Sequence, residues 1–218
     1  MPGATSLRAF CFRKGRFRLT SPWTLQLLVP ADRSCFPQVE AAIRGGVTLV
    51  QLREKQRSDR ETYRVGMELR ELVRRAGAAF FVNDRTDLAL ALGADGVHVG
   101  EGDLPVDVVR RIAPGLMIGA SSHDLESARR AQAADYVAFG PVFPTPSKED
   151  AAAPAGVAAL RRAAAEIPRP LVAIGGIAAE NLPQLRQSGI AGLAVISAIL
   201  GASDPEAAAR RLREEFLA

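Results

Sequence analysis

The chain has 218 residues, of which 48% are hydrophobic and 24% are charged, the balance of a globular protein with a sizeable core. No apolar run approaches the roughly 20 residues needed to cross a bilayer, so the composition excludes a membrane-spanning protein. The formal net charge of +4 arises in the first 23 residues, which hold five basic side chains and no acid; the rest has 23 basic and 24 acidic residues. A nearly neutral body argues against an extended groove for nucleic acid, although small phosphorylated ligands need only local charge.

Residues 1–23 are predicted to form a basic, disordered extension ahead of a single domain at 24–218. The aromatic residues of this segment follow no helical or strand period, and it lacks the continuous apolar stretch of a secretory signal. A start site placed too early and an organelle presequence are the alternatives. The only cysteines, Cys11 and Cys35, form no C-x-x-C pair. They therefore indicate neither a disulfide framework nor a cysteine metal site, and they fit a cytoplasmic protein.

From residue 25 the chain repeats one pattern, a short apolar run, a turn and an amphipathic helical stretch, which predicts serial βα units. The predicted strands are residues 25–29, 48–52, 79–82, 96–99, 117–120, 136–139, 171–174 and 192–196. The predicted helices are residues 35–45, 59–76, 86–92, 105–113, 124–133, 156–166, 178–188 and 204–216. Runs that are apolar throughout are typical of parallel strands covered on both faces. Eight units in about 195 residues favour a single (β/α)8 TIM barrel over an open doubly wound sheet.

In such a barrel the carboxyl ends of the strands form the active face, so the polar residues after each apolar run are the functional candidates. Gln51, Arg53 and Lys55 alternate at the end of one run and can point into the mouth together. Glu54 is expected only to screen its neighbours. Only three of the 28 basic residues are lysines, and a lysine offers a compact point charge where arginine offers a planar fork. The alternatives are a solvated charge cluster and a compositional bias.

Two carboxylates follow the next two runs. Asn83 and Asp84 directly follow the run at 79–82, and Asp103 comes shortly after the run at 96–99. Carboxylate oxygens on neighbouring strand ends suit Mg²⁺, which keeps several waters and takes phosphate oxygens for its remaining ligands. Each aspartate has an alternative role as the N-cap of the helix that follows it.

The later strand ends carry hydroxyls and glycines. Ser121 and Ser122 precede His123, but no nucleophile elbow surrounds them, so their hydroxyls are interpreted as phosphate or helix-cap hydrogen-bonding groups. The loop at 140–148 contains three prolines, two hydroxyls and a lysine, as expected of an ordered functional loop. Gly175-Gly176 and Ile196-Ser197 follow the last two strands, where barrels frequently bind phosphate through backbone N–H groups.

Six of these segments resemble the thiamine-phosphate synthase family and its relative, the thiazole tautomerase, over residues 25 to 216. The motifs are Gln51-Leu52-Arg53-Glu54-Lys55, Val82-Asn83-Asp84-Arg85, Gly96-Val97-His98-Val99-Gly100 with Asp103-Leu104-Pro105, Phe139-Gly140-Pro141-Val142-Phe143-Pro144-Thr145-Pro146-Ser147-Lys148, Ala173-Ile174-Gly175-Gly176-Ile177 and Val195-Ile196-Ser197-Ala198-Ile199. Six motifs in order at six strand ends make the resemblance specific.

The resemblance implies a transferase that joins a hydroxymethylpyrimidine diphosphate to a thiazole phosphate and releases pyrophosphate. In this family the pyrophosphate leaves first, and the thiazole nitrogen captures a pyrimidine-stabilised carbocation, so no covalent nucleophile is expected. By this resemblance, the residues that bind the pyrimidine diphosphate are Gln51, Arg53, Lys55, Asn83, Ser121 and Lys148. The thiazole phosphate would be held by Thr145, Ser147, Gly176, Ile196 and Ser197. Asp84 and Asp103 would hold Mg²⁺.

The chain departs from the family pattern at three places. It has Pro30-Ala31-Asp32-Arg33 where the family usually has Thr-Asp, and Ser147 where threonine is commoner. It has Glu101-Gly102-Asp103 where Gln-Glu-Asp is usual, so a carboxylate near the expected metal is lost unless Glu101 replaces it.

Two other functions are retained as alternatives. One is the tautomerase, with His123 as acid or base, although relatives of that kind generally lack an aspartate at the position of Asp103. The other is a non-catalytic barrel that binds a phosphate ligand. The expected partners are phosphorylated small molecules, and the sequence is compatible with a homo-oligomer.

Overall fold

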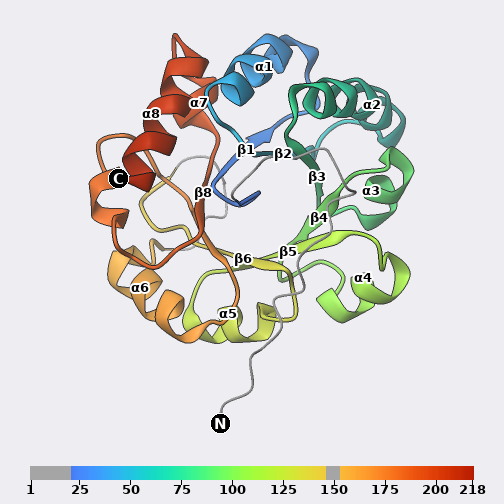
Figure 1. Ribbon diagram of the computed structural model, residues 1–218. Coiled ribbons are helices and arrows are strands. Elements are labelled where there is room, and N and C mark those ends of the chain that lie inside the picture. Colours follow the sequence, from blue (N-terminus) through green and yellow to red (C-terminus); the bar gives the residue numbers. More distant parts are fainter. Residues whose placement is uncertain (1–20, 146–152) are drawn as a thin grey trace.

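The computed structural model describes residues 21–145 and 153–218, and these form one closed ring of eight parallel strands, β1 to β8 in order. Figure 1 looks down this ring and shows helices around its outside. The strands are β1 Leu25–Val29, β2 Leu49–Leu52, β3 Ala79–Asn83, β4 Gly96–Val99, β5 Met117–Ser122, β6 Tyr136–Phe139, β7 Leu171–Ile174 and β8 Gly192–Val195. The ring closes where β8 pairs with β1, with Leu25 opposite Leu193 and Leu27 opposite Val195. The predicted TIM barrel is confirmed.

Helices link the strands along the outside of the ring. They are η1 Arg33–Cys35, α1 Phe36–Arg44, α2 Asp59–Ala76, α3 Thr86–Leu92, α4 Val106–Ile112, α5 Leu125–Ala131, α6 Gly156–Glu166, η2 Leu182–Leu185, α7 Ser197–Leu200 and α8 Pro205–Leu217. The longest, α2, begins where the Ser58 side chain accepts the N–H of Glu61 and ends at Gly77, which takes the left-handed conformation at φ 85°. None of the described helices is long and apolar enough to cross a membrane.

The seventh predicted helix, at 178–188, is wrong. The structure has only the short 3-10 helix η2 there. Pro183 lacks the N–H that a longer helix would need. The Asn181 side chain also accepts from the backbone N–H of Ala178 and donates to the carbonyl of Gly176, which gives the backbone partners outside a helix. The sequence also gave no signal for α7, which starts directly after β8.

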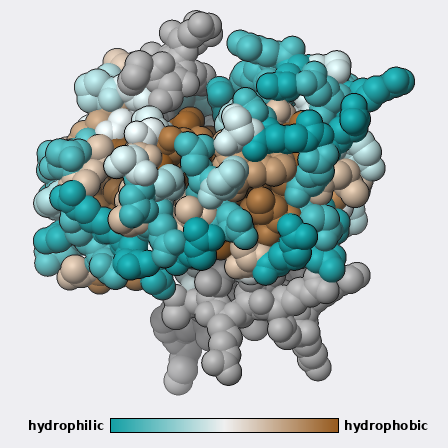
Figure 2. Space-filling view, turned by 90° about the horizontal axis from the view of Figure 1, so that it is seen from above, coloured by the Kyte–Doolittle hydropathy of each residue, from teal (hydrophilic) through white to brown (hydrophobic). Residues whose placement is uncertain are grey.

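Charged side chains cover the outer faces of the helices. Figure 2 shows polar residues over most of one side of the molecule, with hydrophobic residues visible between them. Arg44 on α1 pairs with Glu206 on α8 at 2.9 Å, and Arg33 pairs with Glu68 on α2 at 2.6 Å. About half of the Arg33, Glu68 and Arg44 side chains is exposed, so such pairs add little to stability. The fold is held mainly by its buried apolar layers.

The barrel interior is filled by its own cluster of side chains, separate from the layer between strands and helices. This inner cluster comprises Trp23, Leu28, Leu49, Ala79, Phe81, Met117, Tyr136, Ala138, Val172 and Ala194. Gly119 is required there, because a Cβ at this position would lie 2.3 Å from the Tyr136 ring and 2.5 Å from His98 Nδ1. The absence of a side chain at Gly119 therefore leaves room for the side chains of His98 and Tyr136.

Trp23 is part of the barrel and not of the predicted extension at 1–23. Its side chain is 8% exposed, and its ring lies 4.6 Å from that of Tyr136 and meets Phe81 edge-on at 6.3 Å, measured between ring centroids. Aromatic rings bury large apolar areas and gain further stability from such pairing. Residues 1–20 lie outside the described part of the chain.

Trp23→Ala should therefore destabilise the barrel. Truncating a buried tryptophan removes its apolar burial and leaves a cavity, and we expect the free energy of unfolding to fall by about 3 to 5 kcal/mol. Urea unfolding measures this loss. Leu217→Ala is the control, because Leu217 is 59% exposed and its loss should change stability by about 0.5 kcal/mol or less. Equal effects of the two substitutions would show that Trp23 does not pack in the barrel.

Candidate active site

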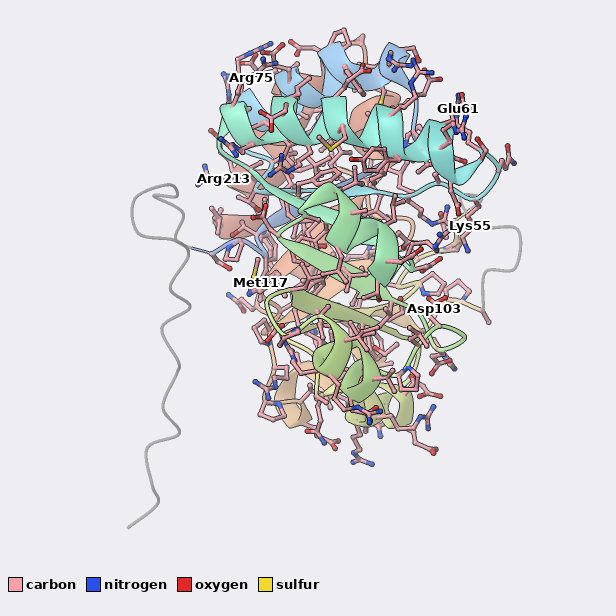
Figure 3. All side chains as sticks on the ribbon, turned by 90° about the vertical axis from the view of Figure 1, so that its right-hand side faces the viewer. Lys55, Glu61, Arg75, Asp103, Met117 and Arg213 are labelled. Carbon is pink, nitrogen blue, oxygen red and sulfur yellow. The ribbon has the colours of Figure 1, made fainter. Side chains whose placement is uncertain are left out.

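The carboxyl ends of the strands open at one end of the barrel, and four of the predicted metal and diphosphate residues gather there. Figure 3 shows Lys55 and Asp103 at this end and Met117 at the opposite one. A cavity of about 440 Å³ lies over β2, β3 and β4. It is lined by Leu52, Glu54, Lys55, Arg57, Asp59, Thr62, Val82, Asn83, Asp84, Arg85, Leu88 and Asp103. The structure thus brings Lys55, Asn83, Asp84 and Asp103 to one cavity.

Glu54 shapes the loop that carries Lys55, a role beyond the expected charge screening. Its carboxylate accepts backbone N–H groups of Ala31 at 3.2 Å, Lys55 at 2.9 Å, Gln56 at 2.8 Å and Arg57 at 3.3 Å. Partial burial alone would raise the pKa of Glu54, but the four N–H donors lower it by more, so the net pKa lies below the usual value. The carboxylate stays ionised and ties the loop after β2 to the end of β1.

Asp84 is the most strongly constrained residue of the cavity. Its backbone adopts φ 62°, which is uncommon for a residue with a Cβ, and its N–H donates to the carbonyl of His98 at 2.7 Å. The Asp84 carboxylate lies 3.7 Å from Lys55 Nζ. Burial, together with a hydrogen bond to the Asp103 carboxyl, raises the pKa of Asp84 to about 6, although Lys55 and Arg53 oppose the shift. Two carboxyl groups this close disfavour full ionisation unless more positive charge is supplied.

Neither aspartate caps a helix. The N-cap positions of α3 and α4 are Arg85 and Pro105, and neither has a side-chain cap. Asp103 instead accepts the backbone N–H of Gly100 at 2.7 Å, which closes the turn after β4. The capping alternative is thereby removed for both residues, and the carboxylates remain available to a ligand in the cavity.

Glu101 does not restore the missing carboxylate. Its two oxygens lie 3.2 Å from His123 Nδ1 and 3.3 Å from Arg130 Nη2, so the side chain is held by residues before and within α5. Within residues 21–145 and 153–218, no cluster of three His, Cys, Asp or Glu side chains could hold a metal. The candidate cation site therefore consists of Asp84 and Asp103 alone, a number that suits Mg²⁺ bound partly by waters and phosphate.

Below the cavity, the inner face of the barrel carries three polar side chains that were not predicted as site residues, those of Gln26, His98 and Tyr136. His98 Nε2 lies 2.9 Å from Ser121 Oγ, its Nδ1 lies 2.8 Å from Tyr136 Oη, and Tyr136 donates to Gln26 Oε1 at 3.3 Å. Burial lowers the pKa of His98 to about 4 and raises that of Tyr136, so both side chains are neutral. The sequence signal that could have identified this site is His98, a polar residue within the otherwise apolar strand at 96–99.

Gln51 faces the same interior. Its side chain is 2% exposed, and its Oε1 has no hydrogen-bond partner in the described part of the chain. A buried polar atom without a partner is costly and is commonly explained by a ligand or a water. The positions of Gln51 and Ser121 place two predicted pyrimidine-binding residues on the barrel floor, apart from the charged cavity wall.

Four further predicted residues, Thr145, Gly176, Ile196 and Ser197, follow β6, β7 and β8. A Cβ on Gly176 would lie 2.4 Å from the carbonyl oxygen of Pro144, and the residue has φ 65°. The Phe143 N–H also donates to the Gly175 carbonyl at 3.1 Å. The glycine pair is therefore required by packing between two loops, whether or not phosphate binds. Ser197 is exposed at the start of α7.

For some of the predicted residues, the structure shows only which strand they follow. Thr145 and Ile196 lie at the same end of the barrel as Ser197, after β6 and β8. Ser147 and Lys148 lie outside the described residues. Among the residues that the structure describes, the predicted ones thus fall into a charged cavity wall, a neutral floor and a region over the last three strands.

A family model described as thiamine monophosphate synthase matches residues 25–199. The chain belongs to the thiamine monophosphate synthase family. The thiamine-phosphate synthase of Chloroflexus aurantiacus is 46% identical over 197 residues, which cover 88% of this chain and 91% of that protein. The thiamine-phosphate synthase of Desulfitobacterium hafniense is 50% identical over 177 residues, covering 80% of this chain and 86% of that protein.

A solved member of the thiamine monophosphate synthase family has the same fold. The thiamine phosphate pyrophosphorylase from Pyrococcus furiosus superposes with a TM-score of 0.81 at 40% identity, covering 90% of this chain and 96% of that one. A 3-hexulose-6-phosphate synthase from Salmonella typhimurium superposes at 0.68 with 19% identity, which shows a likeness of fold alone. The family resemblance inferred from the six motifs is confirmed.

The raised pKa of Asp84 predicts how stability depends on pH in the absence of divalent cations. Its folded pKa of about 6 lies above the usual 3.8, so the folded protein keeps a proton that the unfolded chain releases. The favourable contribution of this Asp84 proton to folding is fully present below the pKa of Asp84 in the unfolded chain. It is lost as the pH rises through the folded pKa of about 6. Asp84→Asn should therefore be more stable than the native protein at about pH 8, and this gain should shrink towards about pH 4.

Urea unfolding with a chelator present at about pH 4, 6 and 8 measures the difference. Asp107→Asn, an exposed change on α4, is the control and should show no such trend. An Asp84→Asn protein that is destabilised equally at every pH would contradict the assigned shift.

Proposed function

We propose that the barrel mouth holds the two substrates of thiamine-phosphate synthesis in adjacent regions, the pyrimidine diphosphate over β2 to β5 and the thiazole phosphate over β6 to β8. The reaction joins a hydroxymethylpyrimidine diphosphate to a thiazole phosphate, forming thiamine phosphate and pyrophosphate. The observation that carries this arrangement is the Asp84–Asp103 carboxyl pair beside Lys55, above a neutral polar floor. A diphosphate fits the charged wall, and an uncharged ring fits the floor.

The donor set fits Mg²⁺. Asp84 and Asp103 supply carboxylate oxygens, and the raised pKa of Asp84 indicates that this pair lacks positive charge. Mg²⁺ is commonly held by one or two carboxylates together with waters and substrate phosphate oxygens. When bound, the ion would neutralise charge on the departing pyrophosphate.

The protein's own groups would assist departure of the leaving group. The bond between the pyrimidine methylene carbon and the diphosphate oxygen breaks, and its electron pair stays on the pyrophosphate. Lys55, Arg53 and Lys148 would stabilise that negative charge, and the Asn83 amide would orient the diphosphate. The thiazole nitrogen then donates its lone pair to the methylene carbon and forms the new bond. This chemistry needs no covalent nucleophile.

The thiazole phosphate is assigned to Thr145, Ser147, Gly176, Ile196 and Ser197. Support comes from Ser197, whose exposed hydroxyl stands at the first turn of α7 directly beyond β8. Loops after the seventh and eighth strands of such barrels frequently bind phosphate.

The arrangement favours the synthase over a tautomerase. A tautomerase needs no diphosphate and no cation site, yet Asp103 is present and lines the same cavity as Asp84. His123, the candidate proton donor for tautomerisation, lies 3.2 Å from a Glu101 oxygen and 3.6 Å from an Asp124 oxygen. These carboxylates engage both nitrogens of its ring.

Asp103→Asn should separate the two substrate regions. The native protein, given both substrates and Mg²⁺, should form thiamine phosphate and pyrophosphate in equal amounts. Loss of one metal carboxylate should lower kcat by about 100-fold or more and raise the Mg²⁺ concentration required, because leaving-group stabilisation is lost. The Kd for thiazole phosphate should stay unchanged. Product and pyrophosphate assays, together with calorimetry, measure these quantities.

Asp107→Asn is the matched control for this experiment, since Asp107 is exposed four residues further along the chain. An Asp103→Asn protein that loses thiazole-phosphate binding as well as turnover would contradict the division of the mouth. Turnover by the native protein without Mg²⁺ would contradict the cation site.

Lys55→Arg should reduce turnover although the charge is kept. The ammonium of Lys55 approaches a single Asp84 oxygen at 3.7 Å, and a planar guanidinium cannot place its charge at the same point. We expect kcat to fall by about tenfold or more. Arg60→Lys, on the exposed first turn of α2, should leave kcat unchanged. Full activity of Lys55→Arg would show that any cation suffices at this position.

A further inference from the structure

Asp84 stands in a strained turn directly after β3. The Arg85 N–H donates to the Asn83 carbonyl at 2.7 Å, and this hydrogen bond closes a three-residue turn around Asp84. The φ of Asp84 is 62°, and among the described residues other than glycine only Gln187 also has a positive φ. Such a turn is rare and strained for a residue with a Cβ, so it persists only where the surrounding structure holds it.

The side chain of Arg85 forms a clamp beside this turn. Its Nη1 and Nη2 donate to the Asp59 carboxylate at 2.7 and 3.0 Å, and its Nε and Nη2 donate to the Asp87 carboxylate at 2.9 and 2.7 Å. Asp59 is the first residue of α2, and Asp87 lies in the first turn of α3. These two helices lie side by side outside the ring (Figure 1). The guanidinium thus joins both helices to the residue that follows Asp84.

The charge of Arg85 is already matched by these two acids. The hydrogen bonds from Arg85 lower the pKa of Asp59 and of Asp87, so both carboxylates stay ionised. A guanidinium has five N–H donors, and the two carboxylates together occupy four of them. Arg85 lines the cavity, but it is therefore better suited to fix the geometry of the site than to bind a diphosphate.

The clamp acts through its geometry. The Arg85, Asp59 and Asp87 side chains are 44%, 73% and 68% exposed, and isolated exposed ion pairs add little to stability. A planar fork that makes two hydrogen bonds to each of two carboxylates also fixes the relative positions of all three groups. Loss of the clamp should therefore move the Asp84 turn and leave the free energy of unfolding little changed.

We propose that Arg85 is a positioning residue whose two-sided clamp on α2 and α3 holds the Asp84 turn in its strained form. In this form the Asp84 carboxylate lies 3.7 Å from Lys55 Nζ and lines the same cavity as Asp103. The inference rests on the proposed cation site of Asp84 and Asp103. Without the clamp the turn relaxes, and the Asp84 carboxylate must be brought back before both acids can bind one cation.

The first test measures binding of Mn²⁺, a spectroscopic substitute for Mg²⁺, to the substrate-free protein by electron paramagnetic resonance. Arg85→Lys keeps the charge but cannot form the double fork. If about a tenth of the molecules then keep Asp84 in place, the Kd for Mn²⁺ should rise about tenfold. Arg33→Lys is the matched control, because Arg33 makes a similar two-bond contact with Glu68 at 2.7 and 2.6 Å and is not among the cavity residues. A native Kd in Arg85→Lys would overturn the proposal.

Asp87→Asn tests the clamp from its other side and leaves Arg85 itself in place. It weakens one half of the double fork, and the Kd for Mn²⁺ should rise about threefold. Asp107→Asn is the control, because Asp107 has the matching place in the first turn of α4 and its change removes the same charge. The same Kd in these two variants would contradict a role for the clamp.

Turnover separates positioning from general damage to the fold. In Arg85→Lys, the Mg²⁺ concentration for half-maximal turnover should rise about tenfold, whereas kcat at saturating Mg²⁺ should lie within about threefold of the native value, because saturation restores the competent population. KM for thiazole phosphate should stay unchanged. A fall in kcat that excess Mg²⁺ does not restore would show that Arg85 supports the fold as a whole, and it would overturn the positioning role.

Asp103→Asn distinguishes failure of this inference from failure of the proposed cation site. It removes one of the two carboxylates and should weaken Mn²⁺ binding more than Arg85→Lys does. If the native protein and Asp103→Asn bind Mn²⁺ alike, the cation site itself is wrong and the clamp proposal is overturned with it. If Asp103→Asn weakens binding and Arg85→Lys does not, the cation site stands and only the clamp is overturned.

Discussion

The pairing of β8 with β1 is the constraint on which the rest of this structure depends. It closes the ring and brings the carboxyl ends of all eight strands to one opening. Lys55, Asp84 and Asp103 come from three successive βα units, and closure of the ring gives them a shared cavity with a packed floor. A closed parallel barrel can place chemistry on its loops because the strands below are fixed by their neighbours and by the filled interior.

Burial sets opposite electrostatic demands on the two layers of the mouth. At the charged cavity wall, burial raises the pKa of Asp84, which lies beside a second carboxyl group. A bound cation would therefore stabilise the ionised form of this pair. At the floor, burial lowers the pKa of His98, which keeps the ring neutral. One physical cause, the cost of placing charge away from water, thus gives a wall that favours added positive charge and a floor that stays neutral.

Two glutamates have roles in the structure that differ from those expected of them. Glu54 gathers four backbone N–H groups into one carboxylate, which fixes the loop that carries Lys55. Glu101 lies against His123 and Arg130, and the candidate cation site is left with two carboxylates. Three of the six family motifs line the cavity, and their positions depend on such supporting contacts.

The sequence by itself determined the barrel, because the spacing of apolar runs is local information and eight βα units have few ways to bury both faces of a parallel sheet. It also placed Lys55, Asn83, Asp84 and Asp103 at the carboxyl ends of the strands, where they line one cavity. It failed at 178–188, where Pro183 and Asn181 compete with helix formation, and at Trp23, whose partners are Phe81 and Tyr136 far along the chain. The tertiary structure alone decided the hydrogen-bond chain through His98, because its members come from four strands and meet only where Gly119 leaves space. Contacts between residues so distant in sequence leave no periodic signal, whereas strand and helix periods do.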